Sequence, residues 1–487
     1  MLVLAGLIVA FFLSRLINLT LLPIFADEAI YIRWSQVILK GKYFIPLTDG
    51  KTPLFMWLLA PFLKLGVDPL VAGRLLSVFS GLATLLGVYF LTKKLFDKPI
   101  ALLASALVVL NPFLLFYDRL SLVDSMLTAI GVWSFYLAYQ LFQKPTLKQG
   151  ILLGFFWLAA LLTKPSGIYY PVLTPFFFLL FPPKNWLKKI KSLILPVGLA
   201  GIIGLGLYQF LRLSDAYHLI ALRSADYLRT LPEILNTLFE FFPQTLAILL
   251  SWLTSYFSLP ALIILILSLA LAIRHRSKKI LLLSLWVLIP FFSQIIIGKI
   301  IRPRYFLPIA PFLLIIISWT VFQAKKVLNL TAIALLGLAL LFWLQFDGYL
   351  LTNPVKAPLN SSEKEQYLEE WSAGFGIKEI TQYLNNLPQD QSALVLTEGS
   401  FGTLPNGLEI YFDNSDNITI LGVGFPKAAT SRPSVTQAFN QGKSVYIVAN
   451  HNRFSFGDQS RLKLIAEYPR VPGKKGQQKL MFYQVQP

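Results

Sequence analysis

The first forty residues, MLVLAGLIVAFFLSRLINLTLLPIFADEAIYIRWSQVILK (1–40), decide how the rest of the chain is interpreted. They begin with an apolar run of about 20 residues, the length at which a helix crosses the hydrocarbon core of a bilayer. The run has no basic segment before it and no obvious small-residue cleavage site after it. It therefore predicts a retained membrane span rather than a signal peptide that is removed. An acidic pair, Asp27 and Glu28, follows shortly afterwards.

Similar apolar runs recur along the first 350 residues, and the whole chain carries few charges. Of the 487 residues, 55% are hydrophobic and 14% are charged, whereas a soluble domain carries about a quarter charged residues. Mean hydropathy is +0.63. We therefore expect a polytopic α-helical membrane protein. About eleven spans of suitable length lie near residues 3–22, 69–92, 99–116, 120–142, 149–163, 166–182, 191–213, 245–273, 279–298, 305–323 and 327–347.

The basic residues form short clusters that follow every second predicted span. Such clusters face the cytoplasm in membrane proteins, so we expect a cytoplasmic N-terminus. The first loop, 23–68, and everything after residue 348 then lie on the opposite, extracytoplasmic face. The clusters are Lys93, Lys94 and Lys98; Lys144 and Lys148; Lys184, Lys188, Lys189 and Lys191; Arg274, His275, Arg276, Lys278 and Lys279; and Lys325 and Lys326.

Residue counts exclude several kinds of site. Cysteine is absent and histidine occurs three times, which excludes disulfides, thiolate chemistry and a histidine-rich metal centre. The net charge is +19. In a soluble protein this charge would indicate nucleic acid, but here it follows the membrane topology, so we expect membrane lipids and no nucleic acid as partners.

The tail, residues 351–487, is more polar than the rest. Short apolar runs at 393–396, 418–421 and 445–448 predict strands, and residues 363–386 and 432–440 predict helices. We expect two domains: a membrane domain over 1–350, with a functional first outer loop at 23–68, and a small extracytoplasmic α/β domain over 351–487.

The first outer loop predicts two helices at the membrane surface. In residues 27–40 the apolar positions recur at helical spacing, which is typical of an amphipathic helix lying in the membrane interface. Gly41 is a plausible end for it. A second helix, too short to span, begins near Pro53 and carries Lys51 just before it. Asp27 and Glu28 either belong to a functional site or simply complement the start of the first helix.

Charged residues also lie within or beside the predicted spans. A carboxylate inside a bilayer costs about 2.5–3.5 kcal/mol, so Asp118 and Asp124 are candidate functional residues; the alternative is a structural pair with Arg119 or Arg74. Lys164, Arg302 and Arg304 are expected at the outer boundary, against the usual charge bias. They would bind a phosphate-like anion, unless they extend toward lipid headgroups.

Together these motifs resemble the GT-C glycosyltransferases that use a polyprenyl-phosphate sugar as donor, especially the protein O-mannosyltransferase and lipid A aminoarabinose transferase group. The resemblance covers about residues 1–325. It rests on FADEAIYIRWSQVILKGKYFIP (25–46), DGKTPLFMWLLAPFLKLG (49–66), AGRLLSVFSGLATLLGVYFLTKKLF (72–96) and YDRLSLVDSMLTAIGVWSFYLAY (117–139), with shorter matches at TKPSG (163–167) and RPRYFLPIAPFL (302–313). The segment WSAGFGIKEITQYL (371–384) also looks like bacterial and archaeal relatives.

The resemblance implies the GT-C fold and a transfer that inverts the anomeric carbon, with an acceptor hydroxyl on a protein, lipid or glycan. Asp27 would be the general base, and Lys51, Arg302 and Arg304 would stabilise the departing phosphate. The remaining substrate-binding candidates are Glu28, Arg74, Asp118, Arg119, Asp124, Lys164 and Tyr305. The aminoarabinose transferases carry Glu where this chain has Gly50, so no metal is assigned; the reaction requires no cofactor, and a divalent metal stays an open alternative.

Three other interpretations compete with the transferase. A transporter or flippase of lipid-linked sugars predicts charges on several spans and often an inverted repeat, but here the charges gather toward one face and no repeat is visible. A ligase or polymerase joining pyrophosphate-linked glycans would need more basic residues facing outward. A receptor would need a ligand-binding motif in the tail, and none is recognisable.

Overall fold

The computed structural model describes residues 2–323, 326–388, 390–425, 429–453 and 458–487; Lys325, which belongs to one of the predicted basic clusters, lies outside them. The chain divides into two compact units. Unit 1 comprises Met1–Ile17, Tyr43–Leu58 and Arg74–Pro358, and unit 2 comprises Asn18–Lys42, Leu59–Gly73 and Leu359–Pro487. The division near residue 358 is close to the boundary predicted at 350. Two segments of the first outer loop, however, group with the C-terminal residues.

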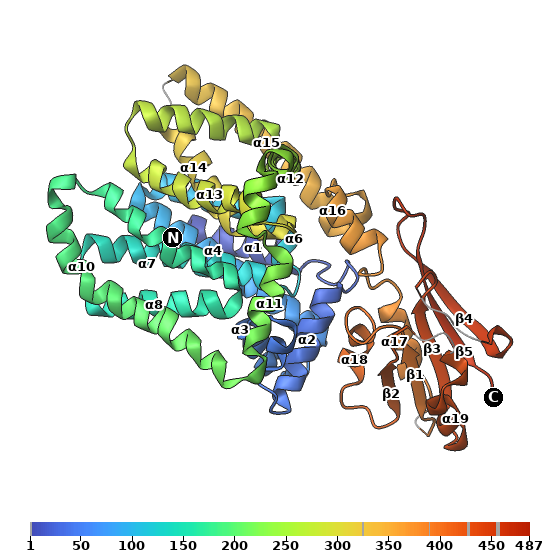
Figure 1. Ribbon diagram of the computed structural model, residues 1–487. Helices are drawn as coiled ribbons and strands as arrows, with labels where there is room; N and C mark the ends of the chain where they lie inside the picture. Colours follow the sequence, from blue (N-terminus) through green and yellow to red (C-terminus); the bar gives the residue numbers. More distant parts are fainter. Residues whose placement is uncertain (1, 324–325, 389, 426–428, 454–457) are drawn as a thin grey trace. The chain divides into compact units, whose positions relative to one another are not determined.

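Unit 1 is helical (Figure 1). Its elements are α1 (Leu2–Leu16), η1 (Ile45–Asp49), α5 (Lys98–Leu110), α6 (Pro112–Asp118), α7 (Val123–Gln143), α8 (Leu147–Thr163), η2 (Pro165–Ile168), α9 (Tyr169–Leu173), η3 (Thr174–Leu180), η4 (Pro183–Asn185), α10 (Trp186–Gly201), η5 (Ile202–Gly206), η6 (Gln209–Leu213), η7 (Asp215–Tyr217), α11 (His218–Tyr227), α12 (Leu231–Arg274), α13 (Lys278–Ile297), η8 (Pro303–Ile309), α14 (Ala310–Gln323), α15 (Lys326–Thr352) and η9 (Pro354–Lys356). Two more helices, α3 (Leu54–Leu63) and α4 (Pro69–Leu95), cross from one unit to the other along the chain.

The predicted spans all overlap helical segments. Within the described residues, six helices are long and apolar enough to cross a membrane by themselves, and a seventh arises if the bent pair α5–α6 is one span. The other predicted spans include the shorter apolar helices at Leu2–Leu16, Leu147–Thr163 and Pro165–Leu180. The chain is therefore a polytopic α-helical membrane protein. Figure 1 shows α7, α8 and α10 side by side, and α7 packs against α8 as α8 packs against α10.

Polar residues set the helix boundaries between these apolar runs. Asp97 accepts a hydrogen bond from the backbone N–H of Ile100 and starts α5, as expected of an N-cap residue. Asn111 then starts α6 in the same way. Because Pro112 cannot donate to the preceding turn, the two helices are bent by 59° at this point.

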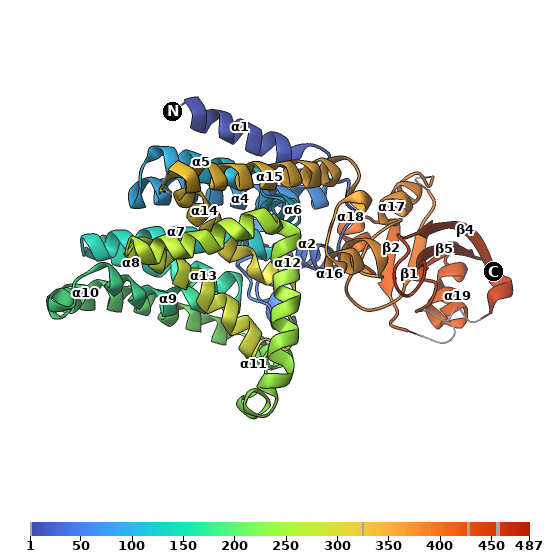
Figure 2. The ribbon, with the colours of Figure 1, turned by 90° about the horizontal axis from the view of Figure 1, so that it is seen from above.

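Helix α12 also bends sharply, as Figure 2 shows. Ser258 has φ 67° and ψ 156° inside it, and Pro260 follows. Since proline interrupts the helical hydrogen bonds, the bend falls at this pair. It separates the first part of α12, whose side chains line the apolar pocket described below, from the remainder.

Unit 2 combines helix α2 (Ala26–Leu39) with an α/β domain. The elements of the domain are α16 (Ser361–Lys364), η10 (Glu365–Glu369), α17 (Ile377–Asn385), β1 (Ala393–Thr397), α18 (Asn406–Phe412), β2 (Ile418–Gly422), η11 (Ala429–Ser431), α19 (Pro433–Asn440), β3 (Ser444–Asn450), η12 (Gln459–Arg461), β4 (Leu462–Pro469) and β5 (Lys479–Val485). The five strands form one sheet in the order β2-β1-β3-β5-β4.

Strands β2, β1 and β3 are parallel, whereas β5 and β4 add to them in antiparallel fashion. Every residue of β1 is buried, as expected for a parallel strand covered on both faces. One face packs against α19, through Val435 and Ala438. On the other face Tyr383 of α17 contacts the rings of Tyr446 and Phe482.

The predicted strands at 393–396, 418–421 and 445–448 are confirmed as β1, β2 and β3, and the predicted helix at 432–440 is confirmed as α19. The single helix predicted over 363–386 is wrong, because α16, η10 and α17 are separated at residues 370–376. Gly376 lies in this break with φ +89°, a conformation that favours glycine. The sequence analysis did not predict α18, β4 or β5.

Candidate functional site

The best-defined polar cluster of unit 1 centres on Asp124, Lys164 and Tyr305. Asp124 lies in the first turn of α7 with 2% of its surface exposed. The Lys164 ammonium group donates a 2.8 Å hydrogen bond to its carboxylate. The same ammonium group lies 4.1 Å from the centre of the Tyr305 ring, within the range of a cation–π contact. Lys164 is thus a partner of Asp124 that the sequence did not indicate, and the predicted pairing with Arg119 or Arg74 stays a prediction.

Two further cations act on Tyr305. Lys51 and Arg304 both interact electrostatically with its hydroxyl group, as Asp124 does, and the Arg304 guanidinium lies 6.0 Å from the ring centre. Arg302 is the N-cap residue of η8, two residues before Arg304. The side chains of Lys51, Lys164, Arg302, Arg304 and Tyr305 are all partly buried. We call Lys51, Asp124, Lys164, Arg304 and Tyr305 the cationic cluster.

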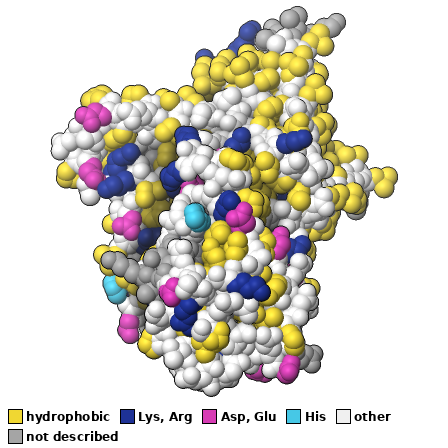
Figure 3. Space-filling view, turned by 90° about the vertical axis from the view of Figure 1, so that its right-hand side faces the viewer, with side chains coloured by type: hydrophobic (Ala, Val, Ile, Leu, Met, Phe, Trp, Pro, Cys, Tyr) yellow, Lys and Arg dark blue, Asp and Glu magenta, His cyan; other side chains and the backbone are white. Residues whose placement is uncertain are grey.

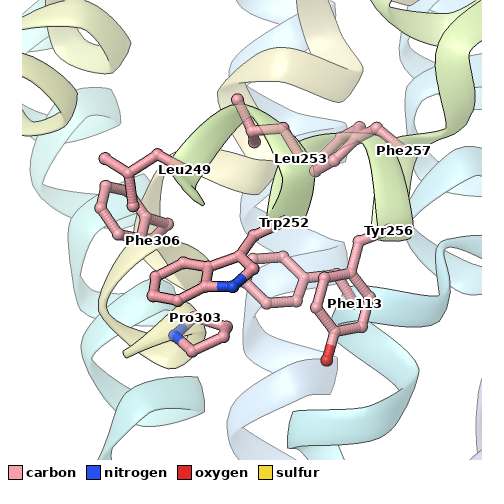
Figure 4. A pocket seen from close by; sticks show the side chains of 8 residues that line it. All are labelled: Phe113, Leu249, Trp252, Leu253, Tyr256, Phe257, Pro303 and Phe306. Carbon is pink, nitrogen blue, oxygen red and sulfur yellow. The ribbon is translucent and has the colours of Figure 1, made fainter. Parts of the chain in front are cut away.

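An apolar pocket is lined in part by residues next in sequence to Arg304 and Tyr305 of this cluster (Figure 4). Pro303 and Phe306, which flank Arg304 and Tyr305 in the sequence, form part of its wall, and Figure 4 shows the Trp252 ring above Pro303. The full lining is Phe113, Leu249, Trp252, Leu253, Tyr256, Phe257, Pro303 and Phe306. Segment η8 thus carries Arg304 and Tyr305 of the cluster together with one side of an aromatic pocket, which suits an amphiphile with an anionic head.

Asp118 lies in a different charged group. Its carboxylate is 3.4 Å from the Arg15 guanidinium and accepts a 2.9 Å hydrogen bond from Ser125. Arg15 is fully buried and also donates to the carbonyls of Val108 and Val109. It interacts electrostatically with Asp347 of α15. These partners indicate that Asp118 joins helices; its predicted contact with substrate stays a prediction.

Arg119 forms hydrogen bonds with backbone carbonyls at the carboxyl end of α1. Its guanidinium donates to the carbonyl oxygens of Ser14, Arg15 and Ile17 over 2.7–3.0 Å. Free carbonyls at a helix end are regularly satisfied in this way by arginine. Arg74 is also buried and acts electrostatically on Arg119. The roles of Arg74 and Arg119 in substrate binding likewise stay predictions.

In unit 2 the predicted helix over 27–40 is confirmed as α2. Asp27 lies in its first turn and is partly buried. Glu28 is fully buried, and its carboxylate accepts a 3.0 Å hydrogen bond from the Phe25 N–H, which closes the first turn as in a capping box. Glu28 thus takes part in starting the helix; its predicted role in substrate binding, and that of Asp27 as the general base, stay predictions.

Part of the polar side of α2, predicted as an interfacial helix, has protein partners. It packs against α18. Arg33 forms ion pairs with Glu409 and Asp413, and Lys40 forms one with Asp413 at 2.6 Å. Gln36 donates to the Ile410 carbonyl. The amphipathic pattern was correct, but the partner of its polar face is protein.

The start of α2 is also held by the C-terminal residues. The Ala26 N–H donates to the Ser372 carbonyl, and the Gly374 N–H donates to the Ile24 carbonyl. Phe25 and Ala373 form an antiparallel bridge, and the Phe25 ring lies 4.4 Å from that of Tyr367. Asp27 thus follows a turn fixed by the α/β domain.

We compared the sequence and the fold with those of known proteins. Residues 50–208 match the model of the family described as dolichyl-phosphate-mannose-protein mannosyltransferase. A search of curated protein sequences finds no match. ArnT from Cupriavidus metallidurans bound to undecaprenyl phosphate superposes with a TM-score of 0.61 at 14% identity, over 99% of this chain and 97% of that one. The apo state of the same enzyme gives 0.59 at 16% identity, with the same coverage.

An oligosaccharyltransferase from Archaeoglobus fulgidus, in complex with Zn and sulfate, gives a TM-score of 0.52 at 13% identity, over 92% of this chain and 68% of that one. This chain has the GT-C fold. The resemblance to GT-C glycosyltransferases stated from the sequence is therefore confirmed, by a family model over part of the chain and by the fold over nearly all of it.

The resemblance to the aminoarabinose transferases raises the question of a metal at position 50. Gly50 has φ +65°, and a Cβ there would come within 2.6 Å of the Leu219 carbonyl oxygen. A side chain at this position would therefore collide with α11. In the described part of the chain, no three His, Cys, Asp or Glu residues are grouped so as to hold a metal ion. The described residues therefore do not supply the acidic side chain that a metal site at position 50 would need.

Sequence reasoning missed Arg15 and Asp347 as members of a buried charged group. Both are charges within apolar runs, which is a recognisable signal, since such residues are rare in membrane spans unless they are paired. The Arg33–Asp413 pair was missed for another reason: its members are 380 residues apart, and no local pattern links them.

Proposed function

We propose that this protein is a membrane glycosyltransferase that moves a sugar from a polyprenyl-phosphate donor to a hydroxyl group of a protein, lipid or glycan acceptor. The observation that carries the proposal is the cationic cluster, in which three cations and one carboxylate converge on Tyr305 beside an apolar pocket. Such a cluster suits a phosphate headgroup attached to a hydrocarbon chain. The GT-C fold and the mannosyltransferase family match support the same conclusion.

The donor headgroup would be bound by the cationic cluster. Lys51 and Arg304 lie close enough to Tyr305 to act on its hydroxyl electrostatically. As the bond between the anomeric carbon and the phosphate oxygen breaks, the phosphate gains negative charge, and fixed cations lower the energy of that transition state. Lys164 is held by Asp124, so it would order the cluster rather than bind the phosphate alone. The first isoprene units would occupy the pocket in Figure 4.

The acceptor hydroxyl would be activated by Asp27. Its carboxylate takes the hydroxyl proton while the acceptor oxygen bonds to the anomeric carbon from the side opposite the phosphate. The configuration at that carbon is thereby inverted, and polyprenyl phosphate leaves. Proton transfer of this kind contributes typically about 10²–10⁴-fold to a rate. The fixed start of α2 supports Asp27 in this role, because a general base has to be held in place.

We also propose that the reaction occurs on the extracytoplasmic face, with the N-terminus in the cytoplasm. The distribution of basic clusters between the apolar helices supports this orientation. Unit 2, including α2 and the α/β domain, would then lie outside the cytoplasm.

The direct test uses the purified protein in lipid nanodiscs with radiolabelled polyprenyl-phosphate sugars and a mixed acceptor extract. Wild-type protein should transfer the sugar, and Asp27→Asn should lower kcat by at least about a hundredfold, as expected for loss of a general base. Lys51→Met and Arg304→Met should slow transfer and raise the KM for the donor.

Asp416→Asn, which removes an exposed carboxylate in unit 2, is the matched control and should leave the rate unchanged. Full activity of Asp27→Asn would exclude Asp27 as the base while leaving the transferase standing. Absence of transfer with every donor, together with movement of lipid-linked sugar across the bilayer, would instead favour a flippase.

A further inference from the structure

The α/β domain has a second polar cluster, at the carboxyl ends of its parallel strands. From β1 the chain passes to β2 on one side, and from β2 it crosses back to β3 on the other side of β1. This reversal makes the space beyond the ends of β1 and β3 a topological switch point, where open α/β sheets bind ligands. Glu398 directly follows β1, and Asn450 ends β3.

Glu398 and Asn450 form the floor of this cluster. The Glu398 carboxylate, 3% exposed, accepts hydrogen bonds from the Asn450 backbone N–H at 2.9 Å and from its side-chain amide at 2.5 Å. Arg453 approaches the same carboxylate at 3.6 Å. The backbone N–H and the side-chain amide nitrogen of Asn450 both donate to Glu398, while its buried side-chain oxygen accepts no hydrogen bond from the described residues.

Arg470, directly after β4, contributes a buried cation. It is 2% exposed, and its Nε donates to the Ala373 carbonyl at 2.9 Å. Both terminal guanidinium nitrogens are buried and have no hydrogen-bond partner in the described part of the chain. Burial lowers the pKa of Arg470 to about 10, against the opposing effect of Glu398 and Glu370, so the group stays charged at neutral pH. A buried charged donor without an acceptor is costly, which points to a ligand.

Further groups define what that ligand would be. Gln478 donates to Glu370 at 2.6 Å, but its buried side-chain oxygen also lacks a partner among the described residues. Trp371 is 37% exposed, and the Arg453 guanidinium lies 4.2 Å from its ring. The cluster thus offers a forked cation, two free amide oxygens and an aromatic ring at its exposed side.

These groups match an acidic saccharide. A guanidinium fork pairs best with a carboxylate or phosphate oxyanion, amide oxygens accept from hydroxyl groups, and an amphipathic aromatic ring packs on the apolar face of a sugar ring. On the face shown in Figure 3, basic and acidic side chains are interspersed rather than sorted by sign. Selection would therefore come from a local site of this kind and not from a broad charged surface.

We propose that the α/β domain binds a saccharide bearing an oxyanion, at the cluster formed by Glu398, Asn450, Arg453, Arg470 and Gln478, with Trp371 beside it. Arg453 and Trp371 are the exposed members, and Arg470 and Asn450 are the buried ones. The proposal concerns binding alone and stands whether or not the protein transfers sugar.

The test is binding of defined oligosaccharides to the full-length protein in nanodiscs, measured by calorimetry without any donor lipid. The probes are oligogalacturonate, which is acidic, and malto-oligosaccharide of equal length, which is neutral. Oligogalacturonate should bind, and Arg453→Ala and Trp371→Ala should each weaken that binding at least about tenfold, as expected for loss of a charged or stacking contact. Both side chains are partly exposed, so these variants should fold.

Lys463→Ala is the matched control, because it removes an exposed cation from β4 of the same domain; its affinity should equal that of the wild type. Arg470→Gln should abolish binding, with folding checked by circular dichroism. Polyglutamate of equal charge separates an acidic saccharide from a mere polyanion. The proposal is overturned if oligogalacturonate does not bind, if polyglutamate binds as well, or if Lys463→Ala weakens binding as much as Arg453→Ala.

Discussion

Lys164 at the end of α8 donates a 2.8 Å hydrogen bond to Asp124 at the start of α7. Each charge lies where the helix dipole favours it: the carboxylate at a helix amino end and the ammonium group at a helix carboxyl end. The two helices pack against each other, so the ion pair ties them together at one end. Tyr305 of η8 then covers the ammonium group.

The first prediction concerns this pair. Lys164→Met should lower the free energy of unfolding by about 1–3 kcal/mol, because it leaves a buried carboxylate unpaired. The effect should stay below that of a fully buried pair, since the Lys164 side chain is 23% exposed. Unfolding by SDS in mixed micelles measures it. Adding Asp124→Asn should restore part of the loss, and Lys148→Met, an exposed lysine of α8, should change nothing. If the losses of unfolding free energy from Lys164→Met and Asp124→Asn simply add in the double variant, the two side chains do not stabilise each other and the prediction is wrong.

The second prediction concerns pH. Burial alone would raise the pKa of Asp413, but hydrogen bonds from Lys40 and Arg33 outweigh it and hold that pKa below its ordinary value. A carboxyl group with a lowered folded pKa stabilises the protein above its unfolded pKa of about 3.9, and this contribution disappears as pH falls through the folded pKa. The difference in unfolding temperature between wild type and Asp413→Asn should therefore be constant from pH 7 to about 5 and shrink below about pH 4.

Asp416→Asn is the control for this series, because Asp416 is an exposed carboxylate in the same unit. Its difference from wild type should be small at every pH. A gap between wild type and Asp413→Asn that widens on acidification would show that the sign is wrong.

The third prediction concerns Gly50. Alanine at this position meets both a left-handed backbone, φ +65°, and a carbonyl oxygen of α11 at 2.6 Å. Gly50→Ala should destabilise the protein by about 1–3 kcal/mol. Gly66 has φ +72° with open space around it, so Gly66→Ala isolates the backbone cost, about 1 kcal/mol. Equal losses in the two variants would mean that contact with α11 contributes nothing.

The fourth prediction concerns Gly81 of α4. A Cβ there would come within 2.5 Å of the Asp118 carboxylate, so the glycine makes room for the Arg15–Asp118 pair. Gly81→Ala should destabilise by about 1–3 kcal/mol, as overpacking does. Gly337→Ala, in a helix with nothing within 4 Å, should instead stabilise by about 0.5–1 kcal/mol. If Gly81→Ala stabilises the protein in the same unfolding assay, the close approach of position 81 to the Asp118 carboxylate is wrong.

The sequence predicted the membrane architecture well because its signals are local. A run of apolar residues identifies a span wherever it occurs; the break at Asn111, inside the span predicted at 99–116, was not predicted. The amphipathic pattern likewise located α2. What the pattern could not identify was the partner: Arg33 and Lys40 would look the same whether they faced lipid headgroups or the carboxylates of α18.

The candidate site was predicted in part. Lys51, Asp124, Lys164, Arg304 and Tyr305 were named from the sequence, and the structure brings these five together within unit 1. Asp118 and Arg119, although adjacent to the same motif, point to Arg15 and to the end of α1. Spacing could not separate these two outcomes, since Asp118 ends α6, Asp124 lies in the first turn of α7, and the chain turns in residues 119–122 between the two helices.

Unit 2 combines segments that lie far apart in the sequence, and this has a consequence for biosynthesis. Arg33 and Asp413 are 380 residues apart, and ribosomes add roughly 5–20 residues per second. Helix α2 is thus made roughly 20–80 s before α18 exists, while the helices of unit 1 are entering the bilayer. Throughout that interval its basic side is without the carboxylates it will bind. Release of a chain truncated before residue 406 would leave α2 permanently in this immature state, so the contacts of α2 are completed only after α18 has been made.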